Sequence, residues 1–268
     1  MRARAPTPVW QGTESDSPVI AVAVHAGHLL RDEIAGVMAL DEATRSREED
    51  LGTEGWADLA PTRLIAMRSR FEADLNRPRD TAIYLTAEDA WGYEVWKEPL
   101  AQDLVERSLA GYDAFYTVLQ GVLDRAERAF GRFVVYDLHS YNHRRGGPDA
   151  EPADPAGHPD VNVGTGSMDR ARWGSLVDRF LGDLRNVTVP WGTGRLDVRE
   201  NVCFRGRQIA AFVHERYPTT GCALAIEIKK FYMDEHTGVL DPDVHPGVGA
   251  ALAATVPGVL AELGRAGT

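Results

Sequence analysis

Short apolar runs alternate with longer amphipathic segments along the chain. Each run has the length and apolar composition typical of a buried strand, and the first is also rich in β-branched residues. The predicted strands cover 18–27, 63–70, 132–140 and 222–230, with a further candidate at 185–191. Helical periodicity covers 86–98, 99–129, 168–185, 200–216 and 245–265. Strands that alternate with helices predict an α/β fold, in which a mixed, mostly parallel sheet carries helices on both faces.

Residues 145–167 show no periodicity and are dense in glycine, proline and aspartate. This composition predicts a long surface loop, and long loops in compact domains often have a functional role. The strand–helix alternation resumes after the loop, so no domain boundary is expected there. We expect a flexible N-terminal tail over 1–17 and a single domain over 18–266.

The composition is ordinary for a globular protein, with 44% hydrophobic and 26% charged residues among 268. The net charge of -11 argues against nucleic acid as a partner, which requires clustered basic residues. It still allows a small anionic substrate, because a few arginines can make one pocket positive. Cys203 and Cys222 lie in apolar runs and are expected in the core.

The N-terminus lacks the apolar segment of a signal peptide, and no apolar run is expected to reach the length of a membrane span. The cytoplasm is therefore the expected location, without a membrane partner. The sequence does not predict the oligomeric state.

Polar, chemically competent side chains follow each of the four main predicted strands. The carboxyl ends of parallel strands share one edge of a sheet, and ligands bind at that edge. His25 and His28 follow the first strand, and His139 follows Asp137 in the third. The other ends carry Arg70 to Arg77 and Glu227 to Lys230. These residues are therefore expected to lie close together.

Two histidines from different strands, together with a carboxylate, are the ligands of a catalytic zinc site that keeps one position open. His25 and His139 are the candidates, and His28 could reach the same ion if the chain turns at Gly27. Each histidine alone could equally well bond a backbone carbonyl. Asp137 is expected to orient a ligand.

Glu227 lies within the apolar run LAIEIKKF, where an unpaired carboxylate is costly. Beside a metal ion it would be the usual general base of a metallohydrolase. The alternative is an ion pair with an arginine or with Lys229, which shares its face of the strand.

Arg70 and Arg77 could bind a carboxylate or stabilise an oxyanion, although each could also be a surface ion pair. Glu48, Glu49 and Asp50 form an acidic cluster, for which a solvated turn is the simpler interpretation.

Five motifs resemble the N-formylglutamate amidohydrolase family, which is related to the zinc carboxypeptidases and aspartoacylase. In order along the chain they are HAG, SRFEADLNRP, DLHS, NVCFRG and AIEIKKFYMDE, over about residues 20–240. The resemblance implies a phosphorylase/hydrolase-like α/β fold with one zinc ion per chain, although another divalent metal would suit the same ligands. It implies His25 and His139 as metal ligands and Glu227 as the general base.

The resemblance also implies that Asn76 and Arg77 bind the substrate carboxylate and that Arg70 lies near the oxyanion. The carboxypeptidase pattern takes its carboxylate ligand from His-x-x-Glu, but His28 stands at that position here. Asp50 is the best match to the downstream acidic motif that replaces it. The predicted ligands are therefore His25, Asp50 and His139, with His28 and then Glu49 as alternatives.

The predicted activity is zinc-dependent hydrolysis of an N-acyl acidic amino acid such as N-formylglutamate. The extra positive groups at His143, Arg144, Arg145, Lys229 and Lys230 go beyond the family pattern and favour a different or larger anionic ligand, although they could also be surface charges. His28, Arg144 and Arg145 are candidates for substrate binding. The alternatives are a metallocarboxypeptidase for small peptides and a non-catalytic, metal-dependent module that binds an anionic metabolite.

Overall fold

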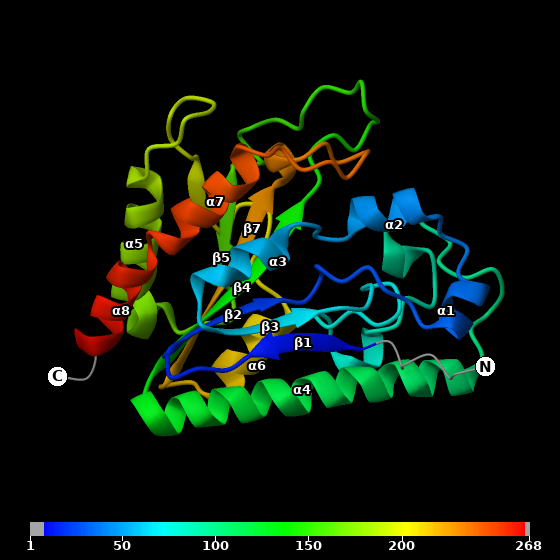
Figure 1. The fold of residues 1–268 in the computed structure, drawn as a ribbon, viewed down its shortest axis with the longest axis horizontal. Helices are drawn as coiled ribbons and strands as arrows, with labels where there is room; N and C mark the ends of the chain where they lie inside the picture. Colours follow the sequence, from blue (N-terminus) through cyan, green and yellow to red (C-terminus); the bar gives the residue numbers. More distant parts are fainter. Residues whose placement is uncertain (1–7, 266–268) are drawn as a thin grey trace.

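The structure, a computed structural model, describes residues 8–265. Its centre is a mixed sheet in the order β1-β3-β2-β4-β7-β5-β6 (Figure 1). Strands β3, β2, β4 and β7 are mutually parallel, whereas β1 and β5 each run antiparallel to their neighbours β3 and β7. The strands are β1 (Trp10–Thr13), β2 (Val19–Ala23), β3 (Thr62–Ala66), β4 (Phe133–Tyr141), β5 (Val161–Gly164), β6 (Val198–Glu200) and β7 (Gly221–Lys229). The predicted fold class, a mostly parallel mixed sheet within an α/β fold, is confirmed.

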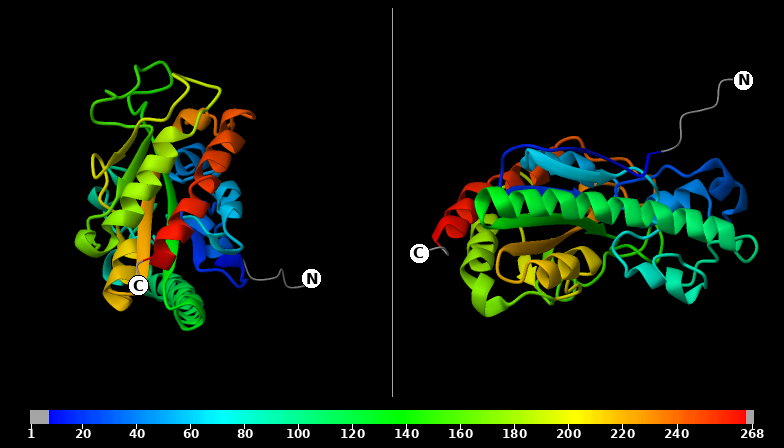
Figure 2. Two further views of the ribbon diagram at one scale, coloured as in Figure 1. Left: turned by 90° about the vertical axis from the view of Figure 1, so that its left-hand side faces the viewer. Right: turned by 90° about the horizontal axis from the view of Figure 1, so that it is seen from below.

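Helices cover both faces of the sheet because both faces of its central strands are apolar. Ile20 and Val22 of β2 pack with residues of α4 (Gln102–Phe130) and α6 (Gln208–Arg216). The alternate residues Val19 and Ala21 belong to the core on the other face. The helices of that face are α3 (Thr53–Trp56), α5 (Arg170–Asn186), α7 (Val244–Ala253) and α8 (Val256–Arg265). Figure 2 shows α4 running the length of the molecule beneath the sheet.

A third, smaller core lies under the segment between β3 and α4. Phe71, Tyr84 and Trp96 are buried there together with Ile34 of α1 (Asp32–Val37). The segment between β2 and β3 also contains α2 (Glu42–Glu48), which leads to the acidic cluster. These contacts fix the chain that follows β3 beside the carboxyl edge of the sheet.

Several predicted elements differ from the structure. Residues 86–98 form only a short 3-10 turn at Glu88–Ala90, because Trp91 and Gly92 adopt positive φ angles and end it. Strand β1 lies within the segment predicted as a tail, where it pairs with β3; residues 1–7 lie outside the described chain. Strand β5 lies within the predicted loop at 145–167. The candidate strand at 185–191 begins with the last two residues of α5 and continues without strand structure.

The predicted helix at 245–265 is divided into α7 and α8, with Ala254 and Thr255 between them. By length and composition, Val244–Arg265 could cross a membrane, contrary to the expectation that no run reaches that length. The two helices instead place Val248, Leu252 and Val259 in the core against the sheet. Such packing is typical of the core helices of an α/β domain.

Gly27 lies where β2 leads into the first polar strand end, and its substitution by alanine is expected to destabilise the fold. A Cβ atom there would lie 2.4 Å from the carbonyl oxygen of Arg68, and backbone atoms cannot yield as a side chain can. We expect Gly27→Ala to lower the free energy of unfolding by about 1–3 kcal/mol. Chemical denaturation measures this change. Gly36→Ala is the matched control, because a Cβ at Gly36 meets nothing within 4 Å; an equal loss in both variants would contradict the prediction.

Candidate metal centre

His25, Asp50 and His139 meet at the carboxyl edge of the sheet. His25 lies two residues beyond the end of β2. His139 lies two residues before the end of the neighbouring parallel strand β4. Oδ2 of Asp50 lies 3.3 Å from Nδ1 of His25 and 3.1 Å from Nδ1 of His139. All three residues are buried, and one ligand atom from each lies within 4.8 Å of the others. This arrangement can hold a metal ion.

The opposite nitrogen of each imidazole is held by a second carboxylate. Nε2 of His25 lies 2.6 Å from Oδ1 of Asp74, and Nε2 of His139 lies 2.9 Å from Oδ1 of Asp137. If each Nε2–H donates to its carboxylate, each Nδ1 keeps its lone pair for an ion. Such carboxylate–histidine pairs are the usual outer support of metal-binding histidines. The donor set and its support therefore fit a bound divalent metal.

The loop after α2 places Asp50 between the two histidines. The Asp50 N–H donates to the carbonyl oxygen of His25 at 2.9 Å. The buried ammonium of Lys230 donates to the carbonyl oxygens of Arg47 and Glu49 at 2.5 and 2.7 Å, which holds the chain immediately before Asp50. Burial lowers the pKa of Lys230 to about 8.

Electrostatics keep the Asp50 carboxylate ionised. Burial opposes its charge, but while both rings carry a proton on Nδ1, their hydrogen bonds and positive charges outweigh burial and hold the pKa of Asp50 well below the usual range. A bound cation would replace those Nδ1 protons and favour the same charged carboxylate. Asp74 behaves alike, because the nearby His25 and Arg70 outweigh its burial and lower its pKa. The cluster thus retains the anionic ligand that a cation requires.

The two alternative third ligands have other partners. Nδ1 of His28 lies 2.5 Å from Oε2 of Glu49, and Ser69 donates to the other Glu49 oxygen. Nε2 of His28 lies 3.2 Å from the guanidinium of Arg45. The structure therefore places His28 and Glu49 in a separate network, and neither belongs to the group of His25, Asp50 and His139.

Glu227 lies beside this cluster on the adjacent strand. It is directly opposite His139 in the parallel β4–β7 pairing, so both side chains lie on the same face of the sheet. Within residues 8–265 its carboxylate has no hydrogen bond or ion pair, and Lys229, the partner considered for it, pairs with Asp160 at 2.7 Å instead. Burial raises the pKa of Glu227 to about 7, and the nearby Asp50 and Asp137 act in the same direction. A carboxylate in this environment can accept a proton.

One cavity joins Glu227 to the cluster of His25, Asp50 and His139. Arg70 lines it, fixed by Asp74 at 2.9 Å and by the Tyr84 hydroxyl at 3.2 Å. Asn76 also lines it, and its Oδ1 accepts the N–H of Ile209. Its Nδ2 lies 3.1 Å from Nε2 of His139, the nitrogen that Asp137 also contacts. The lining residues are His25, Glu48, Asp50, Arg70, Asn76, Trp91, His139, Ser140, Tyr141, Asn142, Arg145, Phe204, Arg207, Glu227 and Lys230.

Not every predicted substrate-binding residue lines this cavity. Arg145 does, with its guanidinium 3.4 Å from Glu48. Arg77 lies outside it, stacks 4.4 Å from the Tyr84 ring centre and donates to the Asp89 carbonyl oxygen. Arg144 and His143 line a different cavity. The binding roles of Arg77, Arg144 and His28 stay predictions.

The structure adds residues to the cavity to which the sequence analysis gave no role at the site. Phe204 and Arg207 precede α6, and Glu48 ends α2. The motif NVCFRG had already pointed to the segment before α6, but it stops at Gly206, one residue short of Arg207. Trp91, whose backbone is left-handed, also lines the cavity, and its ring centre lies 5.0 Å from the Arg70 guanidinium.

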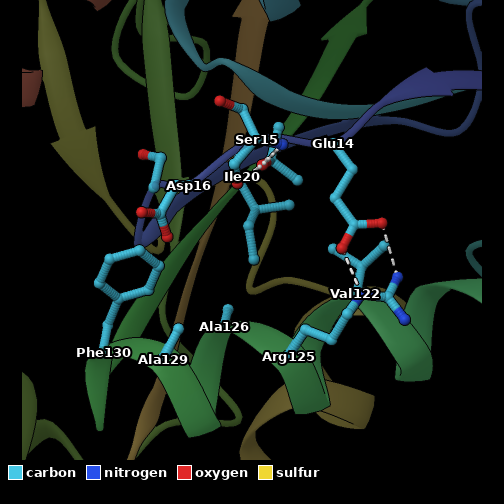
Figure 3. Close-up of a pocket in the computed structure, with 11 residues that line it drawn as sticks. Glu14, Ser15, Asp16, Ile20, Val122, Arg125, Ala126, Ala129 and Phe130 are labelled. Carbon is cyan, nitrogen blue, oxygen red and sulfur yellow. Dashed lines mark hydrogen bonds and ion pairs between the residues drawn. The ribbon is translucent and has the colours of Figure 1, made fainter.

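A second cavity, of about 350 Å³, lies at the opposite edge of the sheet (Figure 3). Ser17 and Ile20 line it at the start of β2, and Ala126 and Phe130 line it near the end of α4. Its arginine, Arg125, is paired with Glu14. It includes none of the three clustered ligands and has no histidine among its lining residues. The cluster of His25, Asp50 and His139 therefore lies away from this cavity, at the carboxyl edge of the sheet.

Replacing Asp137 by asparagine tests the support of His139. The change preserves size but removes the charge that faces Nε2, and Oδ2 of Asp137 has no other partner among the described residues. Metal affinity is expected to fall about tenfold to a hundredfold. Competition with a chromophoric chelator measures this affinity, and circular dichroism of the metal-free protein is the folding control. Wild-type affinity in a folded variant would contradict the assignment.

The fold and the site together define a class: an α/β protein with a buried His-Asp-His cluster, able to hold a metal ion, at the carboxyl edge of a mixed sheet. The sequence model of the N-formylglutamate amidohydrolase family matches residues 17–233. The chain belongs to this family of amidohydrolases, which confirms the resemblance of its motifs. No curated protein matches the chain in a sequence search.

Solved structures superpose on this chain with TM-scores from 0.35 to 0.74, and those above 0.5 share its fold. The N-formylglutamate amidohydrolase from Ralstonia eutropha JMP134 superposes with a TM-score of 0.74 at 18% identity, over 97% of this chain and 99% of that one. A gene product of Agrobacterium tumefaciens gives a TM-score of 0.67 at 16% identity, over 96% of both chains. A metallo-carboxypeptidase from Burkholderia cenocepacia gives a TM-score of 0.35 at 15% identity, over 91% of this chain and 56% of that one.

Proposed function

We propose that this protein is a metal-dependent amidohydrolase that cleaves an N-acyl acidic amino acid, with N-formylglutamate as the first substrate to test. One observation carries the proposal: Glu227, which is buried and has no hydrogen-bond or ion-pair partner among residues 8–265, shares a cavity with the cluster of His25, Asp50 and His139. Family membership supports hydrolysis of an amide bond.

His25, Asp50 and His139 would hold the metal. Two imidazoles and one carboxylate that leave a position open are typical of catalytic zinc, although manganese, iron and cobalt accept the same donors. A bound divalent ion would polarise the acyl carbonyl and make water more acidic.

The residues around the cluster supply the remaining steps. Glu227 takes a proton from the attacking water and delivers it to the leaving amine, since its carboxylate has no competing partner in the described part of the chain. Arg70 stabilises the negative charge that develops on the acyl oxygen, because Asp74 and Tyr84 hold its guanidinium in place. Asn76 and Arg145 bind the substrate near the scissile bond, where both line the cavity.

An anionic substrate fits the charge of the cavity. Four basic side chains line it against the three carboxylates of Glu48, Asp50 and Glu227, and a divalent ion would add further positive charge, although the whole chain carries a net charge of -11. Local positive charge in an acidic protein selects anionic ligands and repels cationic ones.

Hydrolysis assays on the purified protein test this function. We expect formate release from N-formylglutamate, its loss on chelation and its recovery with zinc. A panel of other acyl amino acids and dipeptides distinguishes the alternatives. Preferential release of the C-terminal residue from dipeptides would favour a metallocarboxypeptidase. Metal-dependent binding without turnover of any compound would favour a binding module and contradict the proposal.

A further inference from the structure

Four basic residues line the metal-site cavity, and three of them already have partners. Arg70 donates to Asp74, Arg145 pairs with Glu48, and the Lys230 ammonium donates to two carbonyl oxygens. The fourth, Arg207, makes no side-chain hydrogen bond or ion pair with any residue from 8 to 265. It is therefore the cation that can bind an anionic ligand without breaking an internal contact.

The backbone that carries Arg207 is firmly held. The Gly166 N–H donates to the carbonyl oxygen of Arg205 at 2.7 Å. A Cβ on Gly164 would lie 2.3 Å from the Gly206 nitrogen, so the two segments are in close contact. On the other side, Ile209 N–H donates to Oδ1 of Asn76 at 3.1 Å. The base of the arginine is thus preorganised, and little entropy is lost in the backbone when it binds a ligand.

Arg207 lies at the outer end of the cavity. Its side chain is exposed, whereas His25, Asp50, His139 and Glu227 at the inner end are buried. A substrate whose amide bond reaches Glu227 would therefore extend its far end towards Arg207. In an N-acyl acidic amino acid, that far end is the side-chain carboxylate.

We propose that Arg207 binds the side-chain carboxylate of the substrate and sets the preference for acidic over neutral amino acids. The proposal rests on the proposed function and adds its specificity-determining residue. The planar guanidinium offers two parallel N–H donors that match a carboxylate, and lysine lacks this geometry. Arg207 lies in none of the contacts that hold the metal ligands, so its loss affects substrate recognition and leaves the chemical step intact.

Steady-state kinetics of Arg207→Ala on N-formylglutamate and N-formylglutamine test this inference. These substrates differ only in the charge of the side-chain end. We expect KM for N-formylglutamate to rise about tenfold to a hundredfold, with kcat within about twofold and KM for N-formylglutamine unchanged. Arg207→Lys should recover only part of the loss. Arg205→Ala is the matched control, because Arg205 is exposed two residues away and does not line the cavity.

An unchanged KM ratio in an active Arg207→Ala variant would overturn the inference and leave the proposed function standing. If the wild-type protein hydrolyses neither substrate, the proposed function fails instead, and calorimetry then tests Arg207 alone. Glutarate should bind the wild-type protein more tightly than butyrate does, and Arg207→Ala should abolish the difference. Equal binding of glutarate to both proteins would also overturn the inference.

Discussion

Replacing Glu227 by glutamine is expected to lower kcat for the hydrolysed amide about 10²- to 10⁴-fold, the usual contribution of a general base. The amide has nearly the same shape as the carboxylate but cannot accept the proton of the attacking water. Metal content should stay at the wild-type level, because Glu227 does not belong to the ligand group. Turnover and metal analysis of the same preparation measure both quantities.

Glu48→Gln provides the matched control for this prediction. Glu48 is also a buried glutamate of the same cavity, but it pairs with Arg145 and lies near Arg47. Its replacement should alter KM, because Arg145 loses its ion-pair partner, and kcat should stay close to the wild-type value. Near-wild-type turnover in Glu227→Gln, or a larger loss of kcat in Glu48→Gln, would refute Glu227 as the base.

The parts of the fold that depend on local pattern could be predicted from the sequence. The four central strands carry continuous apolar runs because both of their faces are buried, and each lies where it was expected. Strands β5 and β6 are short and lie at one side of the sheet, so their segments carry too few apolar residues to stand out. The prediction of a helix at 86–98 is wrong because Trp91 adopts a left-handed backbone conformation, which a tryptophan in the sequence does not predict.

The same reasoning explains which site residues the sequence could indicate. His25, His139 and Glu227 follow or end central strands, so topology alone brings them to one edge. Asp50 depends on a loop held by the His25 carbonyl and by Lys230, and only the family pattern pointed to it. Arg207 depends on close contact between two glycine-containing segments far apart in the chain, which no local pattern reveals.

Replacing Asp50 by alanine is expected to abolish tight metal binding and, with it, activity. Asp50 is the only anionic member of the ligand group within the described chain, and both histidine Nδ1 atoms face it. Loss of a direct ligand should cost more than loss of an outer support, so affinity should fall at least about a hundredfold. Metal analysis after dialysis, and the thermal stabilisation that zinc gives the protein, measure the loss.

His28→Ala and Glu49→Gln decide between the possible third ligands. His28 is partly exposed and bonded to Glu49, so both variants should keep the metal even if the local network weakens. The Glu49 change should lower stability through its contacts with Ser69, His28 and Arg45. It should leave the metal in place, because Glu49 does not belong to the group of His25, Asp50 and His139. Metal loss in His28→Ala with retention in Asp50→Ala would transfer the ligand role to His28, and would require the loop after β2 to rotate away from Arg45.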